Sequence, residues 1–116
     1  MTKEEFLQQC SLLPGASLDC PFRSGKGLVA RHRASRRWFA LLMEREGRPF
    51  VNLKCDPMKA DFWRRSCPGV HPGWHMDHLH WNSVCLQEVP DELVCEMLRD
   101  SYRLTAAKQD REALLW

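Results

Sequence analysis

The sequence lacks the features that would direct it to a membrane or out of the cell. No stretch approaches the roughly 18 consecutive apolar residues that a membrane-spanning helix needs. The opening, MTKEEFLQQC, places two acids before a short apolar run and has neither the basic region nor the long apolar region of a secretory signal. We therefore expect a soluble, cytoplasmic protein.

Signatures of paired cysteines and of common enzymes are also absent. The six cysteines include no C-x-x-C pair, which removes the usual zinc-knuckle and thioredoxin-type patterns. Without a secretory signal, free thiols that pack are expected rather than disulfides. There is no glycine-rich phosphate loop, no G-x-S-x-G elbow and no H-E-x-x-H helix. Cys55 and a histidine could supply a nucleophile and a base, but nothing orients a third group toward them, so we expect no enzyme.

The composition is that of an ordinary folded domain. The 116 residues are 44% hydrophobic and 28% charged, which is neither polar enough for disorder nor apolar enough for a membrane. A chain of this length buries about two-thirds of its surface around one core. We expect a single domain over residues 1–116 that is a monomer.

The net charge of +2 is unevenly distributed along the chain. Residues 1–55 contain ten Lys and Arg against five Asp and Glu, whereas residues 56–116 contain seven against ten. Six of the cations fall within residues 23–37, a stretch without any acid. Such a run is either a solvated face or a surface for a polyanion.

Local patterns predict an α+β fold. Thr2 and Glu5 form a capping box that begins a helix, and Pro14-Gly15 ends it. Three strand-like segments follow at 28–32, 38–44 and 49–55, joined by hairpin tips at 33–37 and 45–48.

The second half continues with a helix over 57–66, which Asp56-Pro57 begins, then the loop of residues 68–80, a strand over 81–89 and a last helix from Pro90-Asp91. The predicted order is α-β-β-β-α-β-(β)-α. We expect an antiparallel sheet with helices on one face, which leaves the other face or the loops free for function.

Several segments carry a family resemblance. They are LPGA at 13–16, PF at 21–22, FALL at 39–42, VNLKCDP at 51–57, PGVHPGWHMDHLHWNSV at 68–84 and SYRL at 101–104. In order and spacing the chain resembles the MmcQ/YjbR family over nearly its whole length. The resemblance implies a sandwich like that of the bacterial frataxin CyaY, and a "double-wing" arrangement in which two hairpins grip DNA. Only Glu4 and Glu5 are acidic in the first predicted helix, so an iron-chaperone role is not supported, and we expect no cofactor.

Double-stranded DNA is the partner that the basic hairpin tips favour. Affinity for a duplex comes largely from cations placed on phosphates, and guanidinium groups bind phosphate oxygens in a forked geometry. The predicted phosphate contacts are Arg31, Arg33, Arg36 and Arg37 in the first tip, Arg45 and Arg48 in the second, and Lys54 on the third strand. The second tip also contains Glu44 and Glu46, which make it nearly neutral.

The histidine-rich loop leaves three interpretations open. His71, His75, His78 and His80, with Cys67 and Cys85 nearby, offer nitrogen and sulfur for a transition metal, although we favour no metal. In the favoured interpretation Trp74 and Trp81 anchor the loop while His75 and His80 hydrogen-bond backbone groups. In the third interpretation the loop lines a pocket, and its ligand contacts are Trp74, His75, His80 and Trp81. The protein would then be a protein-interaction or small-ligand-binding module, which is the alternative to DNA binding.

Overall fold

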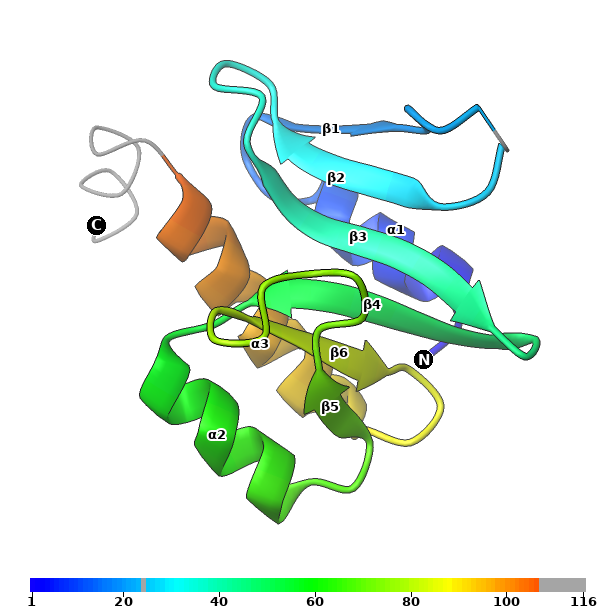
Figure 1. Cartoon of the computed structure of the whole chain (residues 1–116). Helices are drawn as coiled ribbons and strands as arrows, with labels where there is room; N and C mark the ends of the chain where they lie inside the picture. Colours follow the sequence, from blue (N-terminus) through cyan, green and yellow to red (C-terminus); the bar gives the residue numbers. More distant parts are fainter. Residues whose placement is uncertain (24, 107–116) are drawn as a thin grey trace.

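The computed structural model describes residues 1–23 and 25–106, which form three helices and six strands. Figure 1 shows their arrangement along the chain. The elements are α1 (Lys3–Ser11), β1 (Ala16–Asp19), β2 (Leu28–His32), β3 (Trp38–Arg45), β4 (Arg48–Lys54), α2 (Pro57–Ser66), β5 (Val70–Pro72), β6 (Trp81–Cys85) and α3 (Asp91–Thr105).

The strands form one open sheet in the order β1-β2-β3-β4-β6-β5, and every neighbouring pair is antiparallel. The predicted α+β class with an antiparallel sheet is confirmed. Strand β1 was not predicted. The second half was predicted to hold one or two strands, and it holds two, although the position of β5 before β6 was not predicted. Strands β1 and β5 extend the sheet at its two edges. The strand predicted over 81–89 ends at Cys85, where the chain enters a turn.

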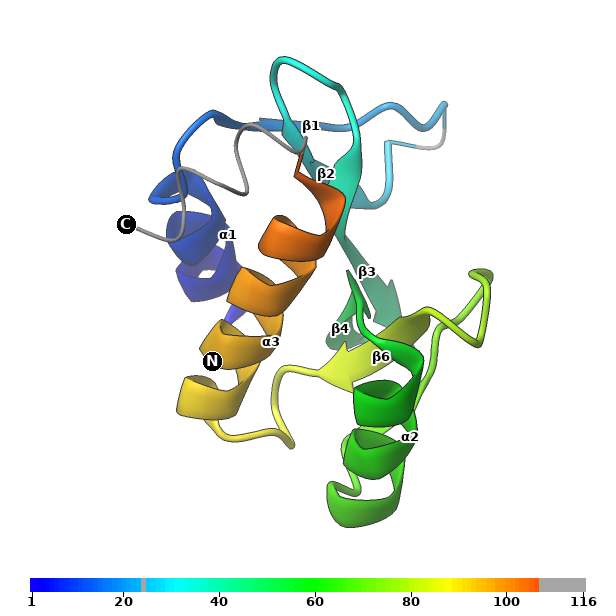
Figure 2. The same ribbon diagram turned by 90° about the vertical axis from the view of Figure 1, so that its left-hand side faces the viewer.

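Helices α1 and α3 lie side by side on one face of the sheet (Figure 2). Helix α2 does not join them: it packs against β5 and β6, so the expectation that the helices share one face holds only for α1 and α3. The opposite face of β4 and β6 is covered in part by the loop of residues 73–80 (Figure 1).

The helix starts follow the local chemistry of the sequence. Thr2 accepts a hydrogen bond from the Glu5 N–H, and the Glu5 carboxylate accepts one from the Thr2 N–H, which completes the predicted capping box. Asp56 caps α2 by accepting bonds from the N–H groups of Met58 and Lys59, and Pro57 occupies the first turn. The prediction of α2 over 57–66 is therefore confirmed.

The core lies between α1, α3 and the inner face of the sheet. Its largest fully buried side chains include Phe6 of α1, Phe39 of β3 and Leu53 of β4. Tyr102 of α3 packs edge-on against Phe39, with ring centroids 5.3 Å apart. Among the described residues no helix is long and apolar enough to cross a membrane.

Candidate functional site

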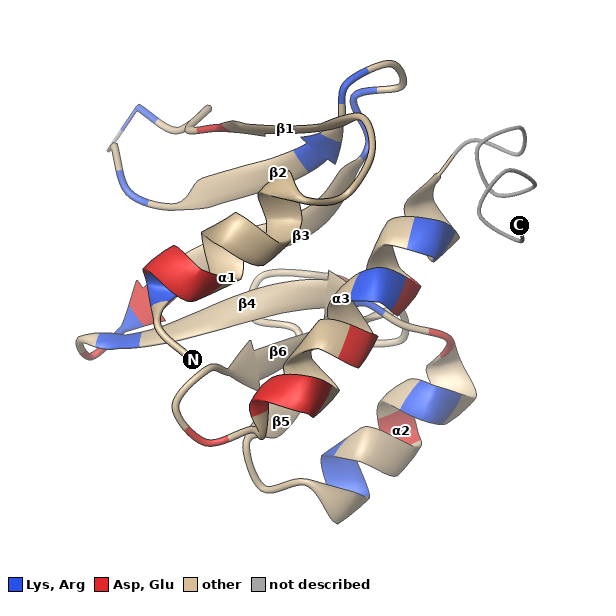
Figure 3. Cartoon of the chain, turned by 180° about the vertical axis from the view of Figure 1, so that it is seen from behind, with Lys and Arg blue, Asp and Glu red and all other residues tan. Residues whose placement is uncertain are grey.

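The basic run of residues 23–37 does not form one surface. Strand β2 lies inside the run, so Arg23 is in the β1–β2 loop at one end of this strand, and Arg33, Arg36 and Arg37 are at its other end. Figure 3 shows blue segments at both places, while red segments mark the first turns of α1 and α3. The only part of the run that gathers several arginines is the β2–β3 hairpin.

The β2–β3 hairpin is held tightly at its base. The His32 N–H donates to the Arg37 carbonyl at 2.9 Å and the Arg36 N–H donates to the His32 carbonyl at 2.7 Å, which closes a loop over residues 33–36. The buried His32 ring lies 2.9 Å from the Thr105 hydroxyl and packs on the ring of Tyr102. The base of the loop is therefore tied to α3 through His32.

The loop exposes three arginines. Arg33, Arg36 and Arg37 are exposed, and within the described part of the chain none of them forms an ion pair with a carboxylate. Arg33 makes one long bond of 3.4 Å to the Ala16 carbonyl. Arg36 has a φ of 65°, in the left-handed region that favours glycine.

Two other predicted phosphate contacts lie at the same end of the sheet. Arg31 is already occupied: its Nε and Nη2 donate to the two oxygens of Asp19 at 3.0 and 2.8 Å, and it lies over the ring of Trp38. Lys54 is half-buried and follows Leu53, which pairs with Ala40 of β3. Its backbone N–H donates to Ser101.

Arg45 and Arg48 lie at the far end of β3. Because a strand rises about 3.4 Å per residue, the eight residues of β3 separate the two hairpin tips by roughly 25 Å. The hairpins share β3 and point in opposite directions (Figure 1). The structure therefore brings together the arginines of the first tip but does not bring those of the second to the same surface.

Both arginines of the β3–β4 hairpin have partners. The Arg45 guanidinium lies 5.2 Å from the centre of the Trp74 ring, and Arg48 donates to the Glu88 carboxylate at 2.5 Å. The turn between them is the two-residue Glu46-Gly47, with φ values of 54° and 78°. Positive φ at both positions is typical of the type I′ turn, whose backbone twist matches the right-handed twist of the two strands that it joins.

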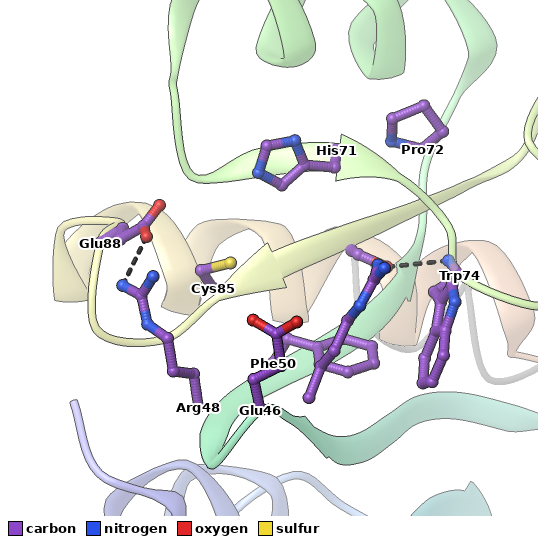
Figure 4. Close-up of a pocket in the computed structure, with 10 residues that line it drawn as sticks. Glu46, Arg48, Phe50, His71, Pro72, Trp74, Cys85 and Glu88 are labelled. Atoms are coloured by element: carbon purple, nitrogen blue, oxygen red, sulfur yellow. Dashed lines mark hydrogen bonds and ion pairs between the residues drawn. The ribbon is translucent and has the colours of Figure 1, made fainter.

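A pocket of about 250 Å³ lies beside this second hairpin (Figure 4). Phe50 and Trp74, with ring centroids 5.5 Å apart, form its apolar wall. Its polar residues are Arg45, Glu46, Arg48, His71, Ser83, Cys85 and Glu88. The pocket combines an aromatic wall with charges of both signs and a thiol.

The histidine-rich loop is held mainly by residues that were not singled out from the sequence. The buried Asn52 donates to the Trp74 carbonyl at 3.0 Å, and the Ser83 hydroxyl donates to Asn52 and accepts from the Trp74 N–H. Arg64 of α2 donates to Asn82 at 2.6 Å and to two carbonyls of the loop end. Trp74 anchors the loop as predicted, and Trp81 is half-buried on β6.

The predicted partners of two histidines need correction. The His80 Nδ1 lies 2.6 Å from the Asp77 carboxylate, so its partner is a side chain and not the backbone. This contact, together with the bond from the Leu79 N–H, holds the pKa of Asp77 below its usual value. Within the described residues the His75 ring forms no hydrogen bond, so the predicted bond to the backbone is not found. The centroids of the His75 and Trp74 rings are 4.3 Å apart, and His75 has a φ of 62°.

The four histidines of residues 68–84 do not converge on one point. Among the described residues, the group whose ligand atoms could hold a metal ion is His71 with Cys85 and Glu88, all within 4.8 Å of one another. His71 and Cys85 were among the donors considered from the sequence, and Glu88 was not. Nothing in the sequence marks Glu88, because only the turn after β6 brings it back to the strand.

The six cysteines are free, as expected. Burial raises the pKa of Cys10 to about 12 and that of Cys55 to about 11. Burial, and then the charge of Glu88, also raise the pKa of Cys85, whereas Arg48 lowers it. Cys20 is exposed. The buried thiols are thus kept protonated at neutral pH, which does not suit a nucleophile.

The fold and these sites define a class: small α+β proteins with an open antiparallel sheet, two helices on one face and surface sites at the hairpins. Sequence comparison makes the assignment narrower. The YjbR family model matches residues 12–104, and the chain belongs to this family. The family resemblance inferred from the motifs is therefore confirmed.

Three curated relatives illustrate the range of similarity. Escherichia coli (strain K12) "Uncharacterized protein YjbR" is 31% identical over 104 residues, 89% of this chain and 86% of that protein. Bacillus subtilis "Uncharacterized protein YyaQ" is 28% identical over 90% of this chain and 98% of that protein. Escherichia coli O157:H7 "Uncharacterized protein YbdF" is 37% identical over 78 residues, and the chain spans 64% of its length.

Solved structures have the same fold. The Deinococcus radiodurans protein DR2400 superposes with a TM-score of 0.84 at 30% identity, over 97% of this chain and 87% of that one. A Pseudomonas syringae protein superposes with a TM-score of 0.83 at 24% identity, over 91% of this chain and all of that one.

Proposed function

We propose that this protein binds double-stranded DNA without sequence specificity, and that the β2–β3 hairpin supplies the phosphate contacts. The observation that carries the proposal is the set of exposed arginines in one loop, Arg33, Arg36 and Arg37, which have no carboxylate partner in the described chain. Guanidinium groups that are not paired with a carboxylate keep their charge, and most of their donors, available for phosphate oxygens.

The backbone of Arg36 supports the same conclusion. A residue with a side chain in the left-handed region costs about 1–2 kcal/mol relative to the right-handed one, a cost that glycine avoids. Arg36 has this conformation at φ 65°, and its side chain is exposed and forms no ion pair within the described part of the chain. The turn requires this backbone conformation, as it does at Glu46, but a glycine would adopt it at lower cost, so an arginine at this position favours a contact made by its side chain.

The proposal is narrower than the double-wing arrangement that the resemblance implies. Arg45 and Arg48 are occupied by Trp74 and Glu88 at the opposite end of β3, and Arg31 is paired with Asp19. We assign phosphate contact to the three loop arginines and, at the same end of the sheet, a supporting role to Lys54. Few contacts predict weak binding with a modest dependence on salt, because the salt slope scales with the number of phosphates contacted.

The experiment is a fluorescence-anisotropy titration of random duplex DNA at several salt concentrations. Three phosphate contacts give a slope of about −2.7 in log K against log salt, so affinity should fall about fortyfold between 50 and 200 mM salt. The double substitution Arg36→Gln with Arg37→Gln should reduce this slope by about 2 and weaken binding for every sequence tested.

The matched control is Arg45→Gln with Arg48→Gln, which removes the same charge from the other hairpin and should leave the slope unchanged. Binding weaker than about 10⁻⁴ M at low salt, or independent of salt, would exclude the proposal. That result would favour the alternative, a protein-interaction or small-ligand-binding module built on the 71–81 loop. Of that loop, His71, Pro72 and Trp74 line the pocket.

A further inference from the structure

The pocket wall beside the β3–β4 hairpin contains three side chains of different ligand chemistry. We propose that His71, Cys85 and Glu88 bind a divalent transition-metal ion of the zinc class. This site goes beyond DNA binding and shares no residue with the β2–β3 hairpin, so either proposal can fail without the other. Figure 4 shows the three side chains on β5, on β6 and on the following turn.

The backbone brings the three residues together through strand pairing. His71 pairs with Ser83 across β5 and β6, and Cys85 lies two residues farther along β6, so both side chains project from the same face of the sheet. The Cys85 N–H donates to the Gly69 carbonyl at 2.9 Å, which fixes the register at this position. Two ligands thus stand on paired strands rather than on a loop.

The third ligand depends on a tight turn and a glycine. The Glu88 N–H donates to the Cys85 carbonyl at 3.1 Å, so the chain turns back and places Glu88 near Cys85. A Cβ atom at Gly69 would lie 2.9 Å from the Glu88 Cβ and 2.7 Å from a Val89 methyl. Only a glycine at this position allows the turn to pack this closely against the start of β5.

The ligand atoms of the three residues are close enough for side-chain rotation to bring them to one metal ion. The ligand atoms of the three residues lie within 4.8 Å of one another. In a tetrahedral zinc site with bonds of 2.0–2.3 Å, ligand atoms are about 3.5 Å apart. His71 and Glu88 are exposed and Cys85 is half-buried, so side-chain rotation can supply a contraction of about 1 Å without moving the strands.

The ligand types select the metal. One imidazole nitrogen, one thiolate and one carboxylate suit zinc and its neighbours, whereas magnesium and calcium prefer sets made of oxygen atoms. Three protein ligands leave a fourth position, which here faces a pocket of about 250 Å³. A metal bound in this way can also hold a small anionic ligand in the pocket.

Arg48 regulates the strength of the site. It donates to the Oε1 atom of Glu88, and the carboxylate has a second oxygen for the metal. The guanidinium orients this carboxylate, but its charge repels a divalent cation. Arg48→Gln should therefore tighten zinc binding, because the repulsion is lost while all three ligands remain.

The test is a zinc titration against a chromophoric chelator at neutral pH with a reducing agent present. Cys85→Ser and His71→Gln should each weaken zinc binding at least tenfold. Substitution of a residue that only hydrogen-bonds a metal ligand already lowers metal affinity about tenfold to hundredfold, and loss of the ligand itself should cost no less. The matched controls are Cys95→Ser, a half-buried thiol on α3, and His78→Gln, an exposed histidine of the neighbouring loop. Both controls should bind zinc as the unmodified chain does.

Two further measurements separate a site from adventitious binding. Cobalt in place of zinc should give a thiolate-to-metal charge-transfer absorption that Cys85→Ser abolishes. Zinc should also raise the melting temperature of the unmodified chain and not that of folded His71→Gln. If His78→Gln weakens binding while Cys85→Ser does not, or if no binding is detected in the chelator assay, the site does not exist.

Discussion

The two hairpins that share β3 contain similar numbers of arginines in very different surroundings. In the β2–β3 hairpin, Arg36 and Arg37 are exposed and no ion pair holds them in the described structure. In the β3–β4 hairpin, Arg45 stacks on Trp74 and Arg48 pairs with Glu88. The number of arginines therefore does not define a phosphate-binding surface. The partners that each arginine already has in the fold decide whether its charge is available to a phosphate.

Turn length explains the difference. The two-residue turn Glu46-Gly47 keeps Arg45 and Arg48 within the sheet, directly opposite each other. Two cations so placed repel each other, and the contacts with Trp74 and Glu88 offset this repulsion. The longer loop of residues 33–36 extends past the neighbouring strands, so its side chains meet solvent.

The largest effect is expected from Asn52, which holds the loop of residues 73–80 at the β3–β4 end. Asn52→Ala removes bonds to the Trp74 carbonyl and from the Ser83 hydroxyl in a fully buried position. We expect a loss of about 2–4 kcal/mol in the free energy of unfolding, because buried partners are left unsatisfied.

Urea unfolding measures this loss, and Ser35→Ala in the other hairpin is the control. Ser35 accepts one bond of 3.3 Å at an exposed position, so its loss should stay within about 0.5 kcal/mol. Similar losses for both substitutions would show that the Asn52 bonds do not hold the loop.

Cys55, which follows β4, and Cys85, at the end of β6, should differ in reactivity. Burial raises the pKa of Cys55, at the β2–β3 end, to about 11 from an ordinary 9.0, so its thiolate fraction at pH 8 is lower by a factor of about 100. Cys85, at the pocket end, is only half-buried. We expect iodoacetamide to modify the exposed Cys20 first, then Cys85, and Cys55 much later, as peptide mapping by mass spectrometry would measure.

The same shift predicts how stability depends on pH. The pKa of Cys55 is higher in the folded chain than the ordinary 9.0 of an unfolded one. Its contribution to stability is therefore fully present below pH 9 and is lost as the pH rises from 9 toward 11, when the unfolded chain releases the proton first. Cys55→Ser should make the urea midpoint less sensitive to pH in this range; an unchanged pH profile would contradict the assignment.

Much of the fold was predictable from local chemistry. The capping box at Thr2, the Asp56-Pro57 start of α2 and the apolar runs of β3 and β4 are signals carried by adjacent residues. Strands β1 and β5 were not predictable, because they are short edge segments whose pairing depends on distant partners. Residues 70–72 contain a histidine and a proline, and only β6 makes them a strand.

The most specific motifs proved to be structural. Asn52 of VNLKCDP and Ser83 of HWNSV bond each other, and Asn82 of the second motif accepts from Arg64. The sequence marked these two motifs as segments of a family resemblance, but it singled out neither these residues nor their role in holding the loop. The partners of Arg31 and Arg48 were equally hidden, since Asp19 is 12 residues away and Glu88 is 40 residues away.

The smallest effect, and the sharpest test of the comparison, concerns strain in the β2–β3 loop. Arg36→Gly removes a side chain from a backbone with φ 65°, so the free energy of unfolding should rise by up to about 1 kcal/mol. Arg37→Gly removes the same charge at a position without positive φ and should lower it by about 0.5–1 kcal/mol.

Both glycine substitutions should weaken DNA binding equally, and each should reduce the salt slope by about 0.9, since each removes one phosphate contact. Urea unfolding and anisotropy on the same two proteins therefore give opposite signs for stability and the same sign for binding. If stability falls in both variants, the backbone of Arg36 is not strained. If binding changes in neither, the arginines of this hairpin are a solvated surface and not a phosphate site.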